Sequence, residues 1–209
     1  MIRRLVDITV AALFLLLLSP LFALVSLVIV LGSPGNPFYG GRRIGKNGVH
    51  FRMWKFRTMV TGADRIGGSI APRGDPRITP VGRFLRATKI DELPQFFNLL
   101  TGDLTLVGPR PEDPGIVEHY TAEQMETLKV KPGITGPGQI YYTTDQVDSI
   151  PEGVPADKYY LDHLLSDKLR IDLDYLERRT PLSDCRVVWQ TVILMVRALA
   201  NAVTASSVR

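Results

Sequence analysis

Cysteine and histidine are scarce in this sequence, and their scarcity argues against several kinds of site. The single cysteine, Cys185, cannot form an internal disulfide, so a reducing compartment such as the cytosol is its natural setting. The three histidines, at positions 50, 119 and 163, lack metal-ligand spacing, which argues against a zinc site of His and Cys ligands. There is no internal repeat, no low-complexity tract and no series of strand–helix–strand units, so a dinucleotide-binding sheet is not expected.

Charge is nearly absent from residues 5–31, where Asp7 is the only ionisable side chain. About 20 apolar residues span a bilayer, so this run is long enough to cross a membrane or to dip deeply into it. It is too long for the apolar part of a signal peptide, roughly 7–15 residues, and no A-x-A cleavage site follows it. We interpret residues 1–32 as a membrane anchor outside the core, and residues 33–209 as the domain that carries the chemistry.

Basic residues flank both ends of the anchor. Arg3 and Arg4 precede it and three cations lie within residues 42–46, so the positive-inside rule assigns both ends to the cytoplasm. Pro20, near the middle, removes a backbone hydrogen bond, and Ser19 can supply a substitute partner for the freed carbonyl. A helix broken at Ser19 and Pro20 can enter and leave by the same leaflet; a kinked helix that spans the bilayer is the alternative.

Positive charge is concentrated in residues 40–90. This block holds 12 Lys/Arg and 2 acids, a charge of +10, while the rest of the chain holds 13 basic and 19 acidic residues, a charge of −6. A basic block beside an anchor attracts lipid headgroups, substrate phosphates or both, whereas a solvated face that only obeys the positive-inside rule is the alternative. The interleaved aromatics Phe51, Trp54 and Phe56 leave single-stranded nucleic-acid binding open.

The pattern of apolar residues predicts a helix-dominated α+β domain with few short strands. Alternation in residues 49–59 predicts a strand or hairpin arm. Residues 101–111 are expected to form a turn, a short apolar strand and a rigid Pro-Arg-Pro loop. Apolar residues recur at helical spacing over residues 81–100, and Pro94 divides them into two helical pieces, the second starting near 91–94. Further helices are expected over residues 114–129, 159–179 and 182–203, the last in the membrane interface. Loops are expected over residues 33–41, 62–80 and 131–140, continuing irregularly over 143–156.

One apparent phosphate-binding motif lacks the context that it needs. Residues 40–46 (GGRRIGK) match part of a P-loop, but Asn47 stands where Ser or Thr would bind the metal. No apolar strand precedes the motif and no helical pattern follows it. We therefore do not interpret it as a nucleotide P-loop.

Asp91 and Glu92 form the acid pair best suited to chemistry. They stand just before Pro94, at the expected N-terminus of a helix, where free backbone N–H groups stabilise a carboxylate. Arg86 and Lys89 are close in sequence and would draw an anionic donor toward a carboxylate that can attack phosphorus or hold a metal ion. The alternative is an ordinary capping box with a solvated acid.

Three further cations suit an anionic substrate. Lys55 and Arg57 alternate in a predicted strand, so both are expected to point to one side. Arg110 stands between two prolines, on a stiff loop suited to gripping phosphate. Taken singly, each is more simply explained as an ordinary surface charge. Three such cations together with the basic block favour a phosphate-binding site.

These motifs together resemble those of the bacterial sugar transferases, the monotopic polyprenyl-phosphate phosphoglycosyl transferases, in their short form with the catalytic module alone. The resemblance extends over about residues 1–200. It is carried by Ser19 and Pro20 in the anchor and by three segments, KFRTM (55–59), ATKIDELPQFFNLLTGDLTLVGPRP (87–111) and KPGITG (131–136).

The resemblance implies a covalent mechanism. Asp91 falls on the family's nucleophile, which attacks the β-phosphate of a UDP-sugar, releases UMP and becomes a phosphosugar ester. A polyprenyl phosphate such as undecaprenyl phosphate then displaces the aspartate, yielding a polyprenyl diphosphate sugar. The family's Mg²⁺ falls on the same aspartate. Glu92 would position the nucleophile or act as acid or base, and the phosphate-contacting cations would be Arg86, Lys55 and Arg110.

The implied setting is the bacterial inner membrane, with the catalytic domain on the cytoplasmic face and membrane lipids around the anchor. The reaction would be the first membrane step in assembling a polysaccharide or other glycoconjugate. Nucleic acid is not an expected partner, and a homodimer is left open. After KPGITG many members read G-W-A-Q-V and then a polar N-G-R stretch, whereas residues 136–144 here read GPGQIYYTT. The sequence therefore does not name the sugar, the pathway or the prenyl length.

Two other functions stay open on the sequence alone. A non-catalytic anchored module that binds anionic lipid or nucleic acid would explain the basic block, but not an acid pair inside it. A transferase that moves only the sugar would release UDP in place of UMP.

Overall fold

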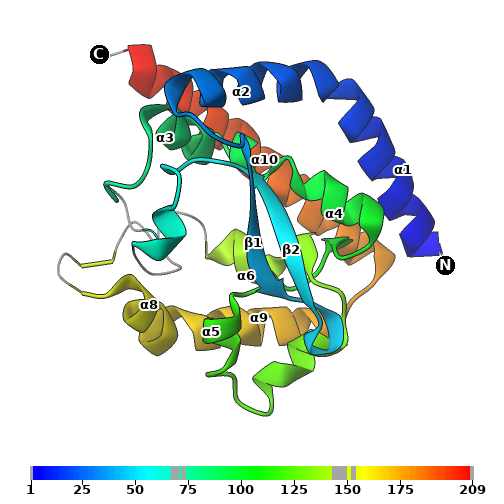
Figure 1. Cartoon of the computed structure of the whole chain (residues 1–209). Coiled ribbons are helices and arrows are strands. Elements are labelled where there is room, and N and C mark those ends of the chain that lie inside the picture. Colours follow the sequence, from blue (N-terminus) through cyan, green and yellow to red (C-terminus); the bar gives the residue numbers. More distant parts are fainter. Residues whose placement is uncertain (1, 67–70, 72–73, 143–149, 152–153, 208–209) are drawn as a thin grey trace.

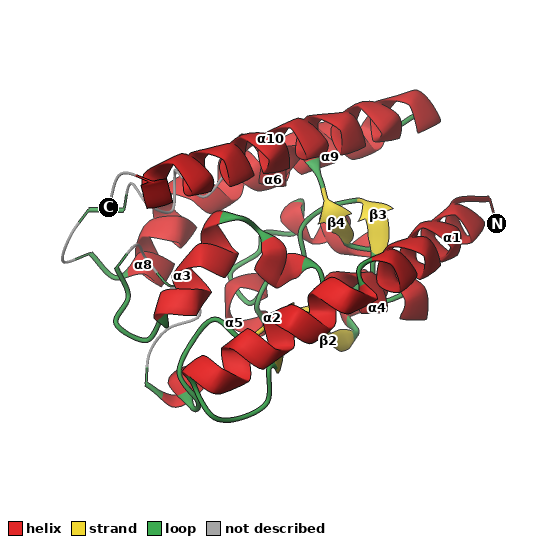
Figure 2. Ribbon diagram, turned by 90° about the horizontal axis from the view of Figure 1, so that it is seen from above, coloured by secondary structure: helices red, strands yellow, loops and turns green. Residues whose placement is uncertain are grey.

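The computed structural model describes residues 2–66, 71, 74–142, 150–151 and 154–207 and has the expected helix-dominated α+β architecture. Two N-terminal helices, α1 (Ile2–Leu17) and α2 (Ser19–Gly32), arch over a central β-hairpin (Figure 1). The long helix α10 (Pro181–Ser207) and the α1–α2 pair run along opposite edges of the molecule when it is viewed from above (Figure 2).

The N-terminal helices form a bent pair. Their axes differ by 61°, and no single helix in the described part of the chain is long and apolar enough to cross a membrane, although the bent pair is, by length and composition. At the bend, Ser19 Oγ donates a 2.8 Å hydrogen bond to the carbonyl of Leu16, the group that Pro20 leaves without its usual i+4 donor. Ser19 and Pro20 therefore stand at the bend, and Ser19 bonds the carbonyl that Pro20 leaves free.

The prediction that the anchor stands outside the core is wrong for one face of α2. Phe22, Val25 and Ile29 are buried in one cluster with Phe56 and Leu85. These positions recur at helical spacing and therefore share one face. Because the sequence around them is apolar throughout, nothing in its polarity singled that face out. The division of the chain into an anchor of residues 1–32 and a separate domain of residues 33–209 stays a prediction.

The central hairpin pairs β1 (Phe38–Ile44) with β2 (His50–Phe56) in antiparallel register. The sequence predicted β2, but it predicted a loop where β1 begins, because two consecutive glycines hide the alternation. The P-loop-like residues 40–46 lie largely in this extended strand and lead into a short turn, η1 (Lys46–Gly48). They therefore form no loop before a helix, as a P-loop requires.

A second sheet contains one predicted strand and one that was not predicted. The short apolar strand expected within residues 101–111 forms as β3 (Thr105–Val107). It pairs in parallel with β4 (Gly133–Thr135), which was not predicted, and α6 (Pro137–Tyr141) follows. Residues 131–140 read as a loop because of their glycines, but these glycines serve close packing. A Cβ atom on Gly133 would lie 2.2 Å from the backbone nitrogen of Gly108, so the two strands can approach only without a side chain there.

The segment around the acid pair contains two helices, as predicted: α3 (Pro80–Ala87) and α4 (Gln95–Thr101). The break between them differs from the prediction. Lys89 adopts a left-handed φ of 59°, and Asp91 and Glu92 lie in a single 3₁₀ turn, η3 (Ile90–Glu92), ahead of α4. The acid pair therefore does not cap an α-helix, which removes the capping-box alternative.

The described C-terminal half of the chain is mostly helical. Of the helix expected over residues 114–129, only α5 (Pro114–Val117) and the 3₁₀ helix η4 (Gln124–Lys129) form. The helix expected over 159–179 is confirmed as a π-helical turn η5 (Tyr160–Leu164), preceded by α8 (Ala156–Tyr159) and followed by α9 (Leu165–Glu177). In the described part of the loop predicted over residues 62–80, a 3₁₀ turn forms, η2 (Ala63–Arg65). Most of the irregular segment expected over 143–156 lies outside the described residues.

Candidate active site

Glu92 is gripped by two cations from different elements. Its Oε1 accepts a 2.9 Å hydrogen bond from Lys55 Nζ, on β2, and a 2.8 Å bond from Arg110 Nη2, on the loop after β3. Oε2 accepts a longer bond, 3.4 Å, from Arg110 Nη1. The hairpin and the Pro109–Pro111 loop thus converge on one carboxylate.

These contacts keep Glu92 ionised. Burial would raise the pKa of Glu92, but Arg110 and Lys55 hold it well below its usual value. Burial lowers the pKa of Lys55, and Glu92 opposes that change. A carboxylate paired in this way holds the two cations in place, and its oxygens are committed to them.

Asp91, unlike Glu92, has a carboxylate oxygen without a hydrogen-bond partner. Only 6% of the residue is exposed, and its Oδ1 has no hydrogen-bond partner. Burial raises the pKa of Asp91, and the charges of Lys55, Lys89 and Arg86 oppose the rise. One oxygen of Asp91 is therefore uncommitted, and the carboxylate is more basic than an exposed one.

Arg86 reaches the same centre from α3. Its Nε donates a 2.9 Å hydrogen bond to Thr58 Oγ1, which fixes the guanidinium beside the end of the hairpin. Burial lowers the pKa of Arg86, and the nearby Asp91 charge opposes that change. The structure thus brings together five of the six predicted site residues, namely Asp91, Glu92, Lys55, Arg86 and Arg110.

Comparison with known families identifies the family of this chain. The sequence pattern described as bacterial sugar transferase matches residues 1–198. The chain belongs to the bacterial sugar transferase family. The resemblance noted from the DELPQ, VGPRP and KPGITG segments is thereby confirmed.

Relatives of this bacterial sugar transferase carry closely related names. A UDP-glucose:undecaprenyl-phosphate glucose-1-phosphate transferase of Escherichia coli (strain K12) is 36% identical over 92% of this chain and 39% of its own length. A protein of the same name from Caulobacter vibrioides is 35% identical over 91% of this chain and 68% of its own. A UDP-N-acetylgalactosamine-undecaprenyl-phosphate N-acetylgalactosaminephosphotransferase of Aeromonas hydrophila is 39% identical over 77% of this chain. This chain spans 39% of the length of the Escherichia and Aeromonas relatives.

Arg57, the sixth predicted residue, is not brought to the acid pair. β2 ends at Phe56, and the guanidinium of Arg57 turns toward the end of α2, where it donates hydrogen bonds to Ser33, Pro34 and Thr61. The expectation that Lys55 and Arg57 serve one site fails because the strand does not continue through both residues. Contact of Arg57 with a substrate phosphate stays a prediction.

Two amide side chains escaped the sequence reasoning because neither carries charge. Asn98, on α4, accepts from the backbone N–H of Trp54 at 2.9 Å and donates to the carbonyl of Arg52 at 2.7 Å, which fastens β2 to α4. Gln139, on α6, accepts from Arg110 Nη1 at 2.8 Å when its amide is oriented to match its neighbours. Each helps to place a cation of the site, Lys55 through its strand and Arg110 directly.

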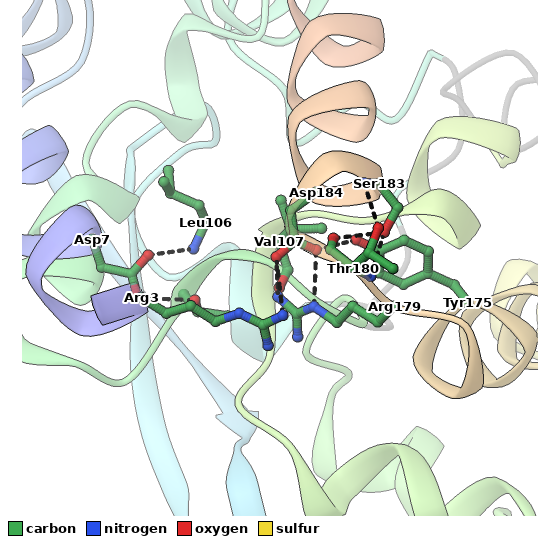
Figure 3. A network of polar contacts seen from close by, with 10 residues as sticks. Arg3, Asp7, Leu106, Val107, Tyr175, Arg179, Thr180, Ser183 and Asp184 are labelled. Atoms are coloured by element: carbon green, nitrogen blue, oxygen red, sulfur yellow. Dashed lines mark hydrogen bonds and ion pairs between the residues drawn. The ribbon is translucent and has the colours of Figure 1, made fainter. Parts of the chain in front are cut away.

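The start of α1 is fastened to the same domain (Figure 3). Asp7, 5% exposed, accepts hydrogen bonds from Thr105 Oγ1 at 2.9 Å and from the backbone N–H of Leu106 at 3.1 Å. Arg3 pairs with Asp184 of α10 at 3.6 Å. Arg4 donates to the carbonyls of Leu99 and Leu100, at 2.6 and 2.7 Å, and so caps the end of α4.

Mg²⁺ is the metal that the sequence resemblance led us to expect. The described residues contain no cluster of three or more His, Cys, Asp or Glu side chains that could hold a metal by themselves. Mg²⁺ is commonly held by one or two carboxylates together with substrate phosphates and water. Asp91, with an unpartnered oxygen, fits that pattern as the protein ligand, whereas the oxygens of Glu92 are taken by cations.

Proposed function

We propose that this protein transfers a sugar-1-phosphate from a UDP-sugar to undecaprenyl phosphate or a similar polyprenyl phosphate, releasing UMP. The observation that carries the proposal is the contrast between two neighbouring carboxylates, one fully paired and one with a free buried oxygen. The names of the relatives support the donor and the acceptor. Because one of these relatives is named for UDP-glucose and another for UDP-N-acetylgalactosamine, the sugar itself is left open.

Asp91 is the nucleophile in this proposal, and Glu92 is not. A carboxylate nucleophile needs a lone pair that no hydrogen bond occupies and enough basicity to attack phosphorus. Asp91 has a free oxygen, and burial raises its pKa and so its basicity. Glu92 has neither property, because Lys55 and Arg110 occupy its oxygens. Its role is to hold these two cations where the donor's phosphates would lie.

The proposed reaction consists of two successive displacements at the β-phosphorus of the donor. The carboxylate oxygen of Asp91 forms a bond to the β-phosphorus while the bond from that phosphorus to the bridging oxygen breaks, and UMP leaves with the electron pair. An oxygen of the polyprenyl phosphate then attacks the same phosphorus, the bond to Asp91 breaks, and the carboxylate is restored. Two displacements at one phosphorus split a difficult exchange into two easier steps.

The cations of the site compensate the charge that builds up. A donor diphosphate and an ionised carboxylate repel each other, so positive charge must lie beside both before attack. Lys55 and Arg110 are fixed by Glu92, and Arg86 is fixed by Thr58. When bound at Asp91, Mg²⁺ would add Lewis-acid polarisation of the diphosphate.

We further propose that the bent pair α1–α2 is a re-entrant anchor in the bacterial inner membrane, with the catalytic domain on the cytoplasmic face. The start of α1 contacts the catalytic domain through Arg3, Arg4 and Asp7. The end of α2 contacts it through Ser33 and Arg57. Both ends of the pair therefore lie against one domain, which supports entry and exit by the same leaflet.

The nucleotide released from the donor tests the proposed function. Purified protein in detergent, with Mg²⁺, undecaprenyl phosphate and a panel of UDP-sugars, should release UMP with at least one donor. Release of UDP would instead favour transfer of the sugar alone. No release from any donor, together with binding to anionic vesicles that weakens steeply with salt, would favour the non-catalytic module. Nucleic-acid stacking has little support, since Phe56 is only 1% exposed.

A further inference from the structure

A cavity of about 200 Å³ lies between the end of α2 and the start of α3. Its walls include Ile29 and Gly32 from α2, Met59 beyond the hairpin, Val81 from α3, and Arg57. Neither member of the acid pair lines it. Sites for drug-sized ligands measure about 300–1,000 Å³, so this cavity is too small for a sugar nucleotide. It can take a headgroup or a short stretch of hydrocarbon.

Arg57 brings an uncompensated charge to this cavity. The residue is 9% exposed, and among the described residues its guanidinium donates only to neutral oxygens, those of Ser33, Pro34 and Thr61. Its Nε has no partner, and within the described ranges no carboxylate pairs with it. A buried cation without an anion is costly. The end of α2 compensates it with only about half an elementary charge.

The apolar walls restrict the class of anion. A free inorganic phosphate would gain nothing from Ile29, Met59 and Val81, which line the same cavity. A phosphate joined to hydrocarbon would gain from both sides, because burial of apolar surface adds to the charge interaction. The end of α2 is also where the proposed anchor leaves the membrane, at the depth of lipid headgroups.

We propose that this cavity binds the phosphate headgroup of a lipid, with the phosphate against Arg57 and the adjoining hydrocarbon against Ile29, Met59 and Val81. The proposal rests on the membrane setting of the proposed function. The lipid is either the polyprenyl phosphate acceptor or a bilayer phospholipid such as phosphatidylglycerol. Both present the same chemistry, a phosphate on a hydrocarbon chain.

Gly32 offers a substitution that fills the cavity without touching Arg57. A Cβ atom there would meet only Val81 Cγ2, at 3.6 Å, which is ordinary contact. Gly32→Ala therefore fits and leaves the space open, and it serves as the matched control. Gly32→Leu places a branched side chain in the cavity. Arg57→Gln is an independent second variant, which removes the charge and retains hydrogen-bond donors for the end of α2.

Photo-crosslinking in vesicles tests the proposal. Full-length protein is placed in phosphatidylcholine vesicles that carry either a photoreactive phosphatidylglycerol or a photoreactive polyprenyl phosphate, and labelled peptides are mapped by mass spectrometry. Wild type and Gly32→Ala should be labelled on the peptides that contain Ile29, Met59 or Val81. In Gly32→Leu and in Arg57→Gln, the labelling of these peptides should be at least about fivefold lower than in wild type. The probe that labels these peptides identifies the source of the lipid.

The contrary results are equally clear. Absence of label on these peptides with both probes overturns the proposal, as does labelling that Gly32→Leu or Arg57→Gln leaves unchanged. UMP release by wild type is measured in parallel with a UDP-sugar. UMP release without cavity labelling rejects the lipid site alone, whereas cavity labelling without UMP release rejects the proposed transfer and leaves the lipid site standing.

Discussion

Asp91 and Glu92 are neighbours in the chain, yet Glu92 Oε1 accepts from Lys55 at 2.9 Å and from Arg110 at 2.8 Å, while Asp91 Oδ1 has no partner. Their pKa values consequently shift in opposite directions, upward for Asp91 and downward for Glu92. Two acids whose surroundings separate their pKa values in this way commonly have different roles in one reaction. The predictions below follow from that division.

Glu92→Gln should leave Lys55 and Arg110 without their anion. Because the two cations are half-buried and repel each other, they should lose their fixed positions, and we expect kcat to fall by roughly 100-fold or more. The measurement is the initial rate of UMP release with saturating donor. Glu118→Gln, on an exposed glutamate, is the matched control and should retain the wild-type rate. A wild-type rate for Glu92→Gln would show that Glu92 does not organise the site.

Removal of the metal should abolish activity. Chelation with EDTA should stop UMP release and added Mg²⁺ should restore it, because the donor diphosphate and Asp91 repel each other. Arg86→Ala should be at least about tenfold more damaging than Arg65→Ala, since Arg86 is held beside the acid pair and Arg65 is exposed. Undiminished activity in EDTA would contradict a requirement for Mg²⁺. Equal effects of the two substitutions would contradict the proposed role of Arg86.

Asp172 should make stability depend on pH. Burial raises its pKa to about 6 from 3.8, so the folded protein binds this proton more tightly than the unfolded chain does. Its contribution to stability is fully present below pH 3.8 and is lost as pH rises through about 6. The loss is at most about 3 kcal/mol. Asp172→Asn cannot ionise and can still accept from the backbone N–H of Gly138.

The difference in Tm between Asp172→Asn and wild type should therefore grow in favour of the variant between about pH 4 and pH 7, and should level off above that. Thermal unfolding in detergent at several pH values measures this difference. Asp174→Asn, on the exposed side of the same helix, is the matched control and should show no such trend. A difference for Asp172→Asn that is constant across pH would mean that Asp172 does not titrate in this range.

The anchor should have both ends in the cytoplasm. A cysteine placed at Ile2, in a Cys185→Ser background, should react only with a reagent on the cytoplasmic side. Replacing Ser19 with Ala and Pro20 with Leu removes the break and restores the backbone bond to Leu16, so part of the population should expose residue 2 on the far side. Reaction of residue 2 in the unmodified anchor with a reagent confined to the periplasm would contradict the re-entrant arrangement.

The charged residues of the site were visible in the sequence because their motifs are local. Asp91, Glu92, Arg86 and Arg110 fall within 25 consecutive residues, and Lys55 lies in a strand whose alternation was readable. The helices over residues 81–100 and 159–179 were predictable for a similar reason, since each has a clear apolar period.

What escaped prediction depends on contacts between distant segments. β4 was hidden by glycines whose function, close approach to Gly108, exists only after folding. The direction of Arg57 could not be read from the alternation in residues 49–59, because the strand ends at Phe56 and the partners Ser33 and Pro34 lie in the turn after α2. Asp7 looked like an interruption of an apolar helix, yet it binds Thr105, which is 98 residues away. Tertiary contacts of this kind leave no local pattern.

The most direct test of the account is mass spectrometry of the protein after incubation with a UDP-sugar and Mg²⁺ in the absence of polyprenyl phosphate. Without an acceptor the ester should accumulate, and we expect an added mass equal to one phosphosugar on the peptide that carries Asp91, together with one equivalent of UMP. The adduct should disappear when undecaprenyl phosphate is added, and it should be absent from Asp91→Asn, with turnover reduced by several orders of magnitude. An adduct on any other residue, or an active Asp91→Asn variant, would contradict the account.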